Sequence, residues 1–226
     1  MDAQVPTPYL GGMVKSSFSS VRHWVFDLDN TLYPPAQRLF DQIEAKMTAF
    51  VSRTLGLDHA ASDALRLQYW RDHGTTLAGL MKHHAVDAEA YLEEVHDISF
   101  DALTPDPRLA DLIGELPGRK IVYTNGSAPY AARVLKARGL DAAFDAIYGV
   151  EHAGYEPKPN RRAFEAVFAR DGTVTAQAAM FEDDARNLAA PHAMGMRTVH
   201  VAPEPAPSEH IHHHTDDLAD FLARLR

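Results

Sequence analysis

The chain has 226 residues, 46% of them hydrophobic, and a formal net charge of −9. This size suits one domain with an insertion and a buried core, while the acidic balance argues against phosphate backbones and anionic surfaces, so we expect neither nucleic acid nor membrane as a partner. Cysteine is absent, which excludes disulfides and thiolate chemistry and fits a reducing, cytoplasmic location.

The N-terminal segment, residues 1–20, contains one basic residue, Lys15, and no continuous apolar stretch. It therefore lacks the features of a signal peptide or a membrane anchor, and we expect a flexible lead-in. No stretch elsewhere approaches the roughly 18 consecutive apolar residues that cross a bilayer.

Short apolar runs alternate with helical patterns along most of the chain, which is typical of βαβ units in a parallel sheet. One helix is expected to start at Pro129 and end at Gly139, and another to run from a cap at Asn160 to Gly172. The sequence thus predicts an α/β fold with a Rossmann-like parallel sheet. The expected strands are residues 23–28, 120–124, 145–150, 179–183 and 197–201.

Residues 35–103 interrupt this alternation, because they contain four helical patterns and no convincing strand. In the first pattern, apolar residues recur at three- and four-residue spacing and form one face. Asp58 and Asp87 are candidate N-caps of later helices. The expected domains are an α/β core of residues 21–34 and 104–226 and an inserted helical domain of residues 35–103.

Polar side chains follow three of the expected strands, at the point where each strand ends. Asp27 and Asp29 follow the first strand, residues 124–127 the second and residues 182–184 the fourth, and Lys158 precedes a helix start nearby. Ligands of open α/β sheets bind beyond the carboxyl ends of the strands. Because crowded carboxylates need a cation, the sequence predicts a Mg²⁺ site that, with the lysine, can hold a phosphate group.

Four short motifs, DLDNTLY, YTNG, EPKP and FEDDARN, resemble in this order the motifs of the haloacid dehalogenase-like (HAD) phosphatases, over residues 21–226. The resemblance implies that Asp27 is the nucleophile, which forms an aspartyl-phosphate. It implies that Asp29 is the general acid and base and that Lys158 neutralises charge on the nucleophile and the phosphate.

The same resemblance implies the remaining site residues. Thr124 and Asn125 would bind phosphoryl oxygens, and Asp184 would either hold a metal-bound water or orient Lys158. Asn187 stands where many relatives have a further acid. The implied Mg²⁺ ligands are Asp27, Asp183 and the backbone carbonyl of Asp29.

Asp29 favours a phosphatase, since dehalogenases resemble this pattern but lack the second aspartate. The helical insertion resembles the cap that such enzymes place over the substrate, and DLDNTLYP together with residues 69–91 resembles the pyrimidine 5'-nucleotidase branch. We therefore expect a small phosphomonoester as substrate, first of all a pyrimidine nucleoside monophosphate. The alternatives are a sugar-phosphate phosphatase or mutase, and a non-catalytic phosphate-binding module.

Aromatic and histidine clusters elsewhere have structural interpretations. Large aromatics of the helical insertion, such as Tyr69, Trp70 and Tyr91, are expected in its core. Tyr33 lies next to the catalytic loop and is the ring expected to contact the substrate. The HIHHH run at 210–214 precedes a capped amphipathic helix, so it is expected to belong to the fold and to hold no catalytic metal.

Overall fold

A parallel sheet forms the centre of the computed structural model, which describes residues 14–226. Its strands are β1 (His23–Phe26), β2 (Arg119–Tyr123), β3 (Ala146–Tyr148), β4 (Ala178–Glu182), β5 (Arg197–Val201) and β6 (His213–Thr215). Their order in the sheet is β3-β2-β1-β4-β5-β6, and every neighbouring pair is parallel. The α/β prediction is confirmed, and each of the five expected strands is present.

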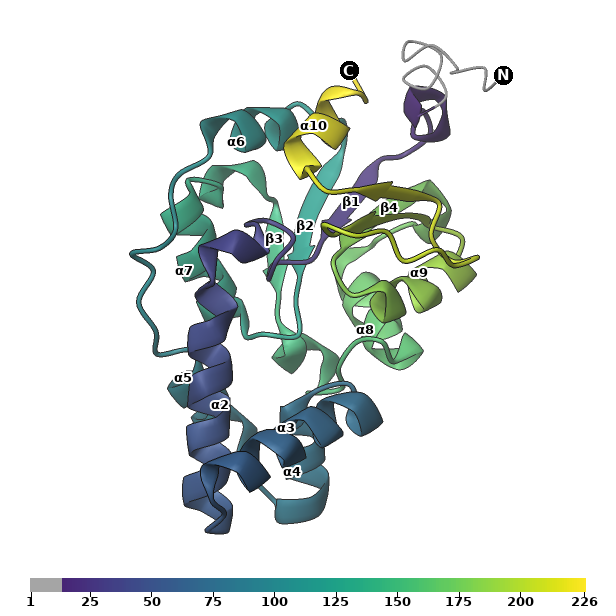
Figure 1. Cartoon of the computed structure of the whole chain (residues 1–226). Coiled ribbons are helices and arrows are strands. Elements are labelled where there is room, and N and C mark those ends of the chain that lie inside the picture. The colour runs from purple at the N-terminus through teal and green to yellow at the C-terminus, as the bar shows by residue number, and fades with distance from the viewer. Residues whose placement is uncertain (1–13) are drawn as a thin grey trace, which may run out of the picture.

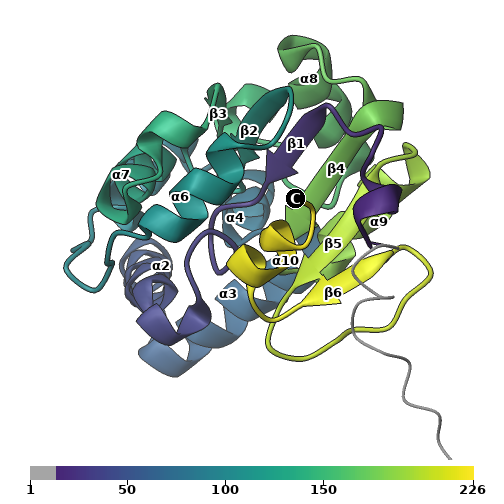
Figure 2. The same ribbon diagram turned by 90° about the horizontal axis from the view of Figure 1, so that it is seen from above.

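Helices cover both faces of the sheet because alternate side chains of each strand point to opposite sides (Figure 2). Trp24 and Phe26 of β1 belong to the core beneath α6 (Pro107–Gly114), α7 (Ala128–Arg138) and α10 (Leu218–Ala223). Val25 faces the other way, toward α8 (Arg161–Asp171), and α9 (Ala189–Ala193) lies on that side too. Burial on both faces explains why the strands read as nearly continuous apolar runs.

The expected flexible lead-in is packed against the core where the structure describes it. Residues 1–13 lie outside the described part of the chain, whereas residues 14–17 are helical. Phe18 is 4% exposed, stacks on Trp24 with ring centroids 6.0 Å apart and meets Phe221 edge-on at 5.8 Å. Residues 14–20 are therefore anchored by this aromatic contact.

Four helices follow one another between β1 and α6, and the sequence predicts the same number for residues 35–103. They are α2 (Leu39–Leu55), α3 (His59–His73), α4 (Thr76–His84) and α5 (Ala88–Val95), and they lie across the carboxyl ends of the strands (Figure 1). The predicted caps form: Asp58 accepts a hydrogen bond from the Ala61 amide at 2.8 Å, and Asp87 from the Ala90 amide at 2.9 Å. We call α2–α5 the helical unit.

The histidine-rich segment contributes an edge strand that the sequence analysis does not identify. The strand is β6, which has three residues and pairs with β5. The side chain of Thr198 holds the approach to this strand, donating to the His210 carbonyl at 2.7 Å and accepting from the His212 amide at 3.1 Å. A strand this short and polar has no apolar alternation to reveal it.

Candidate active site

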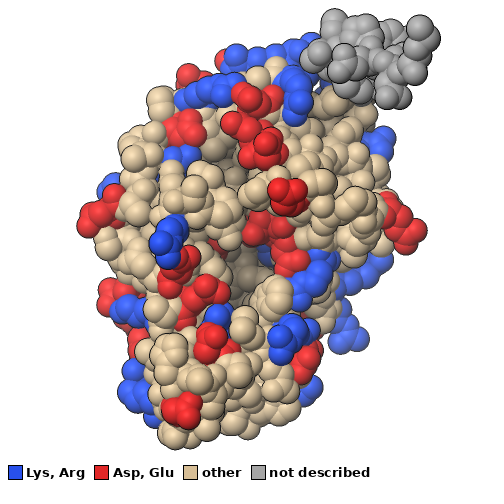
Figure 3. All heavy atoms as spheres, in the orientation of Figure 1, with Lys and Arg blue, Asp and Glu red and all other residues tan. Residues whose placement is uncertain are grey.

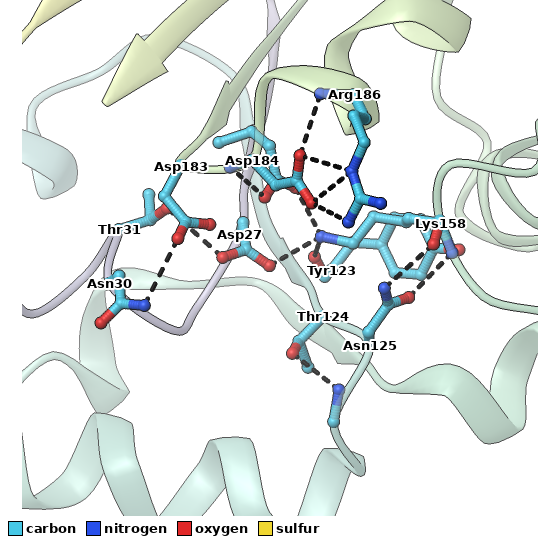
Figure 4. Close-up of polar contacts among 12 residues, drawn as sticks. Asp27, Asn30, Thr31, Tyr123, Thr124, Asn125, Lys158, Asp183, Asp184 and Arg186 are labelled. Carbon is cyan, nitrogen blue, oxygen red and sulfur yellow. Dashed lines mark hydrogen bonds and ion pairs between the residues drawn. The ribbon is translucent and has the colours of Figure 1, made fainter. Parts of the chain in front are cut away.

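A buried lysine joins three strands at the carboxyl edge of the sheet (Figure 4). The Nζ atom of Lys158 lies 2.6 Å from Oδ1 of Asp27 and 2.6 Å from Oε2 of Glu182, and it donates to the Tyr123 carbonyl at 3.1 Å. These contacts use all three ammonium protons. Burial alone would lower the pKa of Lys158, but the two carboxylates raise it above its ordinary value. The lysine is therefore a fixed positive charge.

Asn125 positions the backbone that carries this lysine. Its Oδ1 accepts from the Lys158 amide at 2.8 Å, and its Nδ2 donates to the Lys158 carbonyl at 3.1 Å. The neighbouring Thr124 is 1% exposed, and its Oγ1 accepts from the Gly126 amide at 2.9 Å. The threonine hydroxyl thus keeps its own proton for a ligand oxygen, whereas the Asn125 amide is largely engaged by the lysine loop.

Three acidic side chains gather close enough to share one cation. Carboxylate oxygens of Asp27, Glu182 and Asp183 lie within 4.8 Å of one another, the one such group found among residues 14–226. Burial, and next to it the charge of Glu182, raises the pKa of Asp27 to about 8 despite Lys158, and burial with Glu182 also raises the pKa of Asp183. The Oδ1 atom of Asn187 is buried nearby with no partner in the described part of the chain. Such a set of hard oxygen donors fits Mg²⁺.

Asp29 has different surroundings, because two tyrosines hold its side chain. Its Oδ1 accepts from the hydroxyls of Tyr33 and Tyr130, each at 2.6 Å. Burial raises the pKa of Asp29 above its ordinary range, while these hydrogen bonds oppose the shift. The sequence predicts that Tyr33 contacts the substrate. In the structure Tyr33 is 1% exposed, and its hydroxyl contacts the carboxylate of Asp29, four residues earlier in the chain.

Asp184 pairs with a neighbour rather than with the lysine. Its Oδ2 lies 2.6 Å from Nη2 of Arg186, whose guanidinium carbon lies 3.8 Å from the centre of the Trp70 ring. Trp70, expected in the core of the helical unit, is 42% exposed and spans the gap to this loop. Of the two roles implied for Asp184, orienting Lys158 falls instead to Glu182.

Glu182 and His200 are two of the site residues that receive no individual role from the sequence. The sheet register explains Glu182: Phe26 lies opposite Phe181, so the residue after each, Asp27 and Glu182, meets the same lysine. His200 is 4% exposed and donates from Nε2 to the backbone carbonyl of Asp183 at 2.9 Å. The pairing of the strands would have identified both residues as part of the site. The apolar periodicity of a strand does not show which of its few polar residues face a ligand.

One cavity of about 610 Å³ joins these groups between the core and the helical unit. Figure 3 shows acidic side chains along the hollow between the two parts. The wall formed by the helical unit includes the apolar side chains of Ile43, Met47 and Leu77. The sequence-predicted residues that line the cavity are Asp27, Asp29, Thr124, Asn125, Lys158, Asp183 and Asp184.

Comparison with known proteins agrees with this architecture. The family model of haloacid dehalogenase-like hydrolases matches residues 21–195. Phosphate metabolism protein 8 of Saccharomyces cerevisiae is 26% identical over 190 residues, which cover 76% of this chain and 58% of that protein. The chain thus spans somewhat more than half the length of this curated relative.

Two solved structures illustrate the shared fold. CbbY from Rhodobacter sphaeroides, in complex with phosphate, has a TM-score of 0.66 and 19% identity, and the match covers 91% of this chain and 99% of CbbY. L-2-haloacid dehalogenase from Xanthobacter autotrophicus has a TM-score of 0.51 and 21% identity, with 82% of this chain and 79% of the dehalogenase covered. At such identities the likeness concerns the fold.

Proposed function

Because the chain belongs to the haloacid dehalogenase-like hydrolase family, we propose that it is a Mg²⁺-dependent phosphomonoesterase that works through an aspartyl-phosphate on Asp27. The observation that carries this proposal is the presence of two unlike carboxyl groups on one cavity. Asp27 is paired with Lys158, whereas Asp29 accepts hydrogen bonds from neutral hydroxyls. The first suits a nucleophile and the second a proton donor.

The reaction divides between these two residues. In the first half, a carboxylate oxygen of Asp27 bonds to phosphorus, the ester P–O bond breaks and Asp29 gives its proton to the departing oxygen. In the second half, Asp29 takes a proton from the attacking water, the bond between Asp27 and phosphorus breaks, and inorganic phosphate leaves. Lys158 offsets the charge of Asp27, and the Thr124 hydroxyl donates to a phosphoryl oxygen.

Mg²⁺ is the cofactor that the acidic group fits. Asp27 and Asp183 would hold it, together with the Asp29 backbone carbonyl. Both oxygens of Glu182 already have partners, Lys158 and the Asp184 amide, and the Asp184 carboxylate is engaged by Arg186. The bound ion supplies positive charge, so that a phosphate dianion approaches carboxylates that would otherwise repel it.

Pyrimidine nucleoside monophosphates are the substrates we propose first. The motif DLDNTLYP and the sequence of the helical unit support this choice, and a cavity of about 610 Å³ has the size of a small-molecule site. Its apolar wall suits an uncharged leaving group such as a nucleoside. A sugar phosphate is the alternative within the same chemistry.

Asp29 also supports phosphate ester hydrolysis over dehalogenation, although a dehalogenase shares the fold. A departing alkoxide needs a proton, which an acid on the cavity wall can give. A halide leaves without one. An acid held in this position therefore has a use in the first reaction and none in the second.

The test is phosphate release from UMP, CMP and a panel of sugar monophosphates with Mg²⁺, alongside halide release from 2-chloropropionate. We expect turnover of phosphomonoesters, with the pyrimidine nucleotides fastest, and its abolition by Asp27→Asn. The control is Asp101→Asn at an exposed position, which should keep full activity. Turnover retained in Asp27→Asn would remove the proposed mechanism, and halide release without phosphate release would reverse the assignment.

A further inference from the structure

Two tyrosines from distant parts of the chain converge on one oxygen of Asp29. Tyr33 follows four residues after the aspartate, whereas Tyr130 lies on α7, 101 residues away. Both residues are 1% exposed, and both hydroxyls donate to Oδ1 of Asp29 at 2.6 Å. A phenol is protonated at neutral pH, so each can act as a donor.

The two oxygens of Asp29 are thereby made unequal. Oδ1 is occupied by two donors, while Oδ2 has no protein partner in the part of the chain that the structure describes. Oδ2 is not among the polar atoms that are fully buried without a partner, and Asp29 is one of the residues that line the cavity. The oxygen left for a ligand is therefore Oδ2.

We propose that Tyr33 and Tyr130 are positioning residues, which hold Asp29 by Oδ1 and present Oδ2 to the ester oxygen of a bound phosphomonoester. This inference rests on the proposed function, in which Asp29 transfers the proton. A carboxyl group free to rotate would offer either oxygen in many orientations, whereas effective proton transfer needs a donor within hydrogen-bond distance of the departing atom.

The segment that returns from the helical unit braces Tyr130 in turn. His96, the residue after α5, stacks on the Tyr130 ring with centroids 4.2 Å apart and planes 7° apart. Its Nδ1 lies 3.1 Å from Oγ of Ser127, which caps α7, and Arg133 donates to its backbone carbonyl at 2.8 Å. The stacked imidazole thus holds the tyrosine ring in place, so that its hydroxyl keeps its direction toward Asp29.

The experiment compares substrates that differ in their need for the proton. One is the alkyl phosphomonoester that the wild type hydrolyses fastest, and the other is p-nitrophenyl phosphate, whose leaving group departs without protonation. We expect Tyr33→Phe and Tyr130→Phe each to lower kcat about 10-fold or more for the alkyl ester and less than about 3-fold for p-nitrophenyl phosphate. Asp29→Asn should show the same pattern more strongly.

The matched control is Tyr148→Phe. Tyr148 is also buried, and its hydroxyl also donates to a carboxylate, that of Asp171 at 3.2 Å, but it does not line the cavity. Removing the Tyr148 hydroxyl should leave kcat unchanged for both substrates. In the Asp29→Asn background, Tyr33→Phe and Tyr130→Phe should have no further effect on the alkyl ester, because both act through that carboxyl group.

Failure of this inference is distinguishable from failure of the proposed function. A wild type that turns over no phosphomonoester removes the function itself. An active wild type in which the tyrosine variants slow both substrates equally, or neither, overturns the positioning role. Further loss on adding the tyrosine variants to Asp29→Asn overturns it as well, since the tyrosines would then act elsewhere.

Discussion

Replacing Lys158 by methionine removes the cation that pairs with Asp27 and Glu182. Both ion-pair distances are 2.6 Å, and the side chains are 1% exposed for the lysine and the glutamate and 7% for the aspartate. Methionine resembles the lysine stem in length and volume, so little cavity is created. The substitution therefore tests the charge rather than the packing.

The expected loss of unfolding free energy is about 3–5 kcal/mol, the cost of removing one partner of a buried ion pair. Proton uptake by Asp27 reduces this loss of unfolding free energy, because burial and the charge of Glu182 already raise the pKa of Asp27 to about 8. Without the lysine this pKa rises further, and each added unit offsets about 1.4 kcal/mol at a pH below it. The protonated form is favoured in the fold, so the loss should be smaller at pH 6 than at pH 9.

Urea unfolding with a chelator present, at pH 6 and pH 9, measures this difference. The control is Lys136→Met on α7, where the side chain is exposed and the change should stay within about 0.5 kcal/mol. A loss below about 1 kcal/mol at pH 9, or the same loss at both pH values, would refute the reasoning. The variant should also fail to release phosphate from UMP.

Two further predictions concern metal binding and the helical unit. In the metal-free wild type, the stability that protonated Asp27 contributes is complete below its ordinary pKa of 3.8 and is lost as the pH rises through about 8. Mg²⁺ takes the place of the proton, so it should raise Tm, measured by scanning fluorimetry, more at pH 9 than at pH 6. A rise in Tm that is independent of pH would contradict this. Gly79→Ala would place a Cβ 2.2 Å from Cγ of Tyr69 and should lower the free energy of unfolding in urea by more than about 2 kcal/mol. The control is Gly114→Ala, whose Cβ meets nothing within 4 Å, so its effect should be neutral or stabilising by up to about 1 kcal/mol. Equal effects of the two variants would argue against tight packing of α3 on α4.

The parts of the site that the sequence predicts are those fixed by local pattern and topology. Asp27, Thr124 and Asp183 each follow an apolar run, and a parallel sheet brings the carboxyl ends of neighbouring strands to one edge. No distance is needed to infer that these residues meet. The caps at Asp58 and Asp87 are equally local, because a cap depends on residues three positions apart.

The parts that the sequence does not predict depend on register and on pairing across the chain. That Glu182 rather than Asp184 reaches Lys158 follows from which residue of β4 lies beside Asp27. The sequence does not predict that the Tyr33 hydroxyl donates to Asp29 beside that of Tyr130, because Tyr130 is 101 residues from Asp29 and no local pattern links the two. The edge strand β6 is set by its pairing with β5, not by its own composition.

The contrast between Asp27 and Asp29 bears on how two aspartates two residues apart can take different roles. Asp27 lies in the acidic group that fits Mg²⁺ and also contacts Lys158, so positive charge from two sources would favour its ionised form. The Asp29 side chain lies outside that group and contacts two neutral hydroxyls, so it gains hydrogen bonds without a countercharge while burial raises its pKa. Loading the site with a cation should therefore lower the pKa of Asp27 more than that of Asp29. This difference would leave Asp27 the more readily ionised of the two carboxyl groups and Asp29 the more readily protonated, which is the division that the proposed reaction needs.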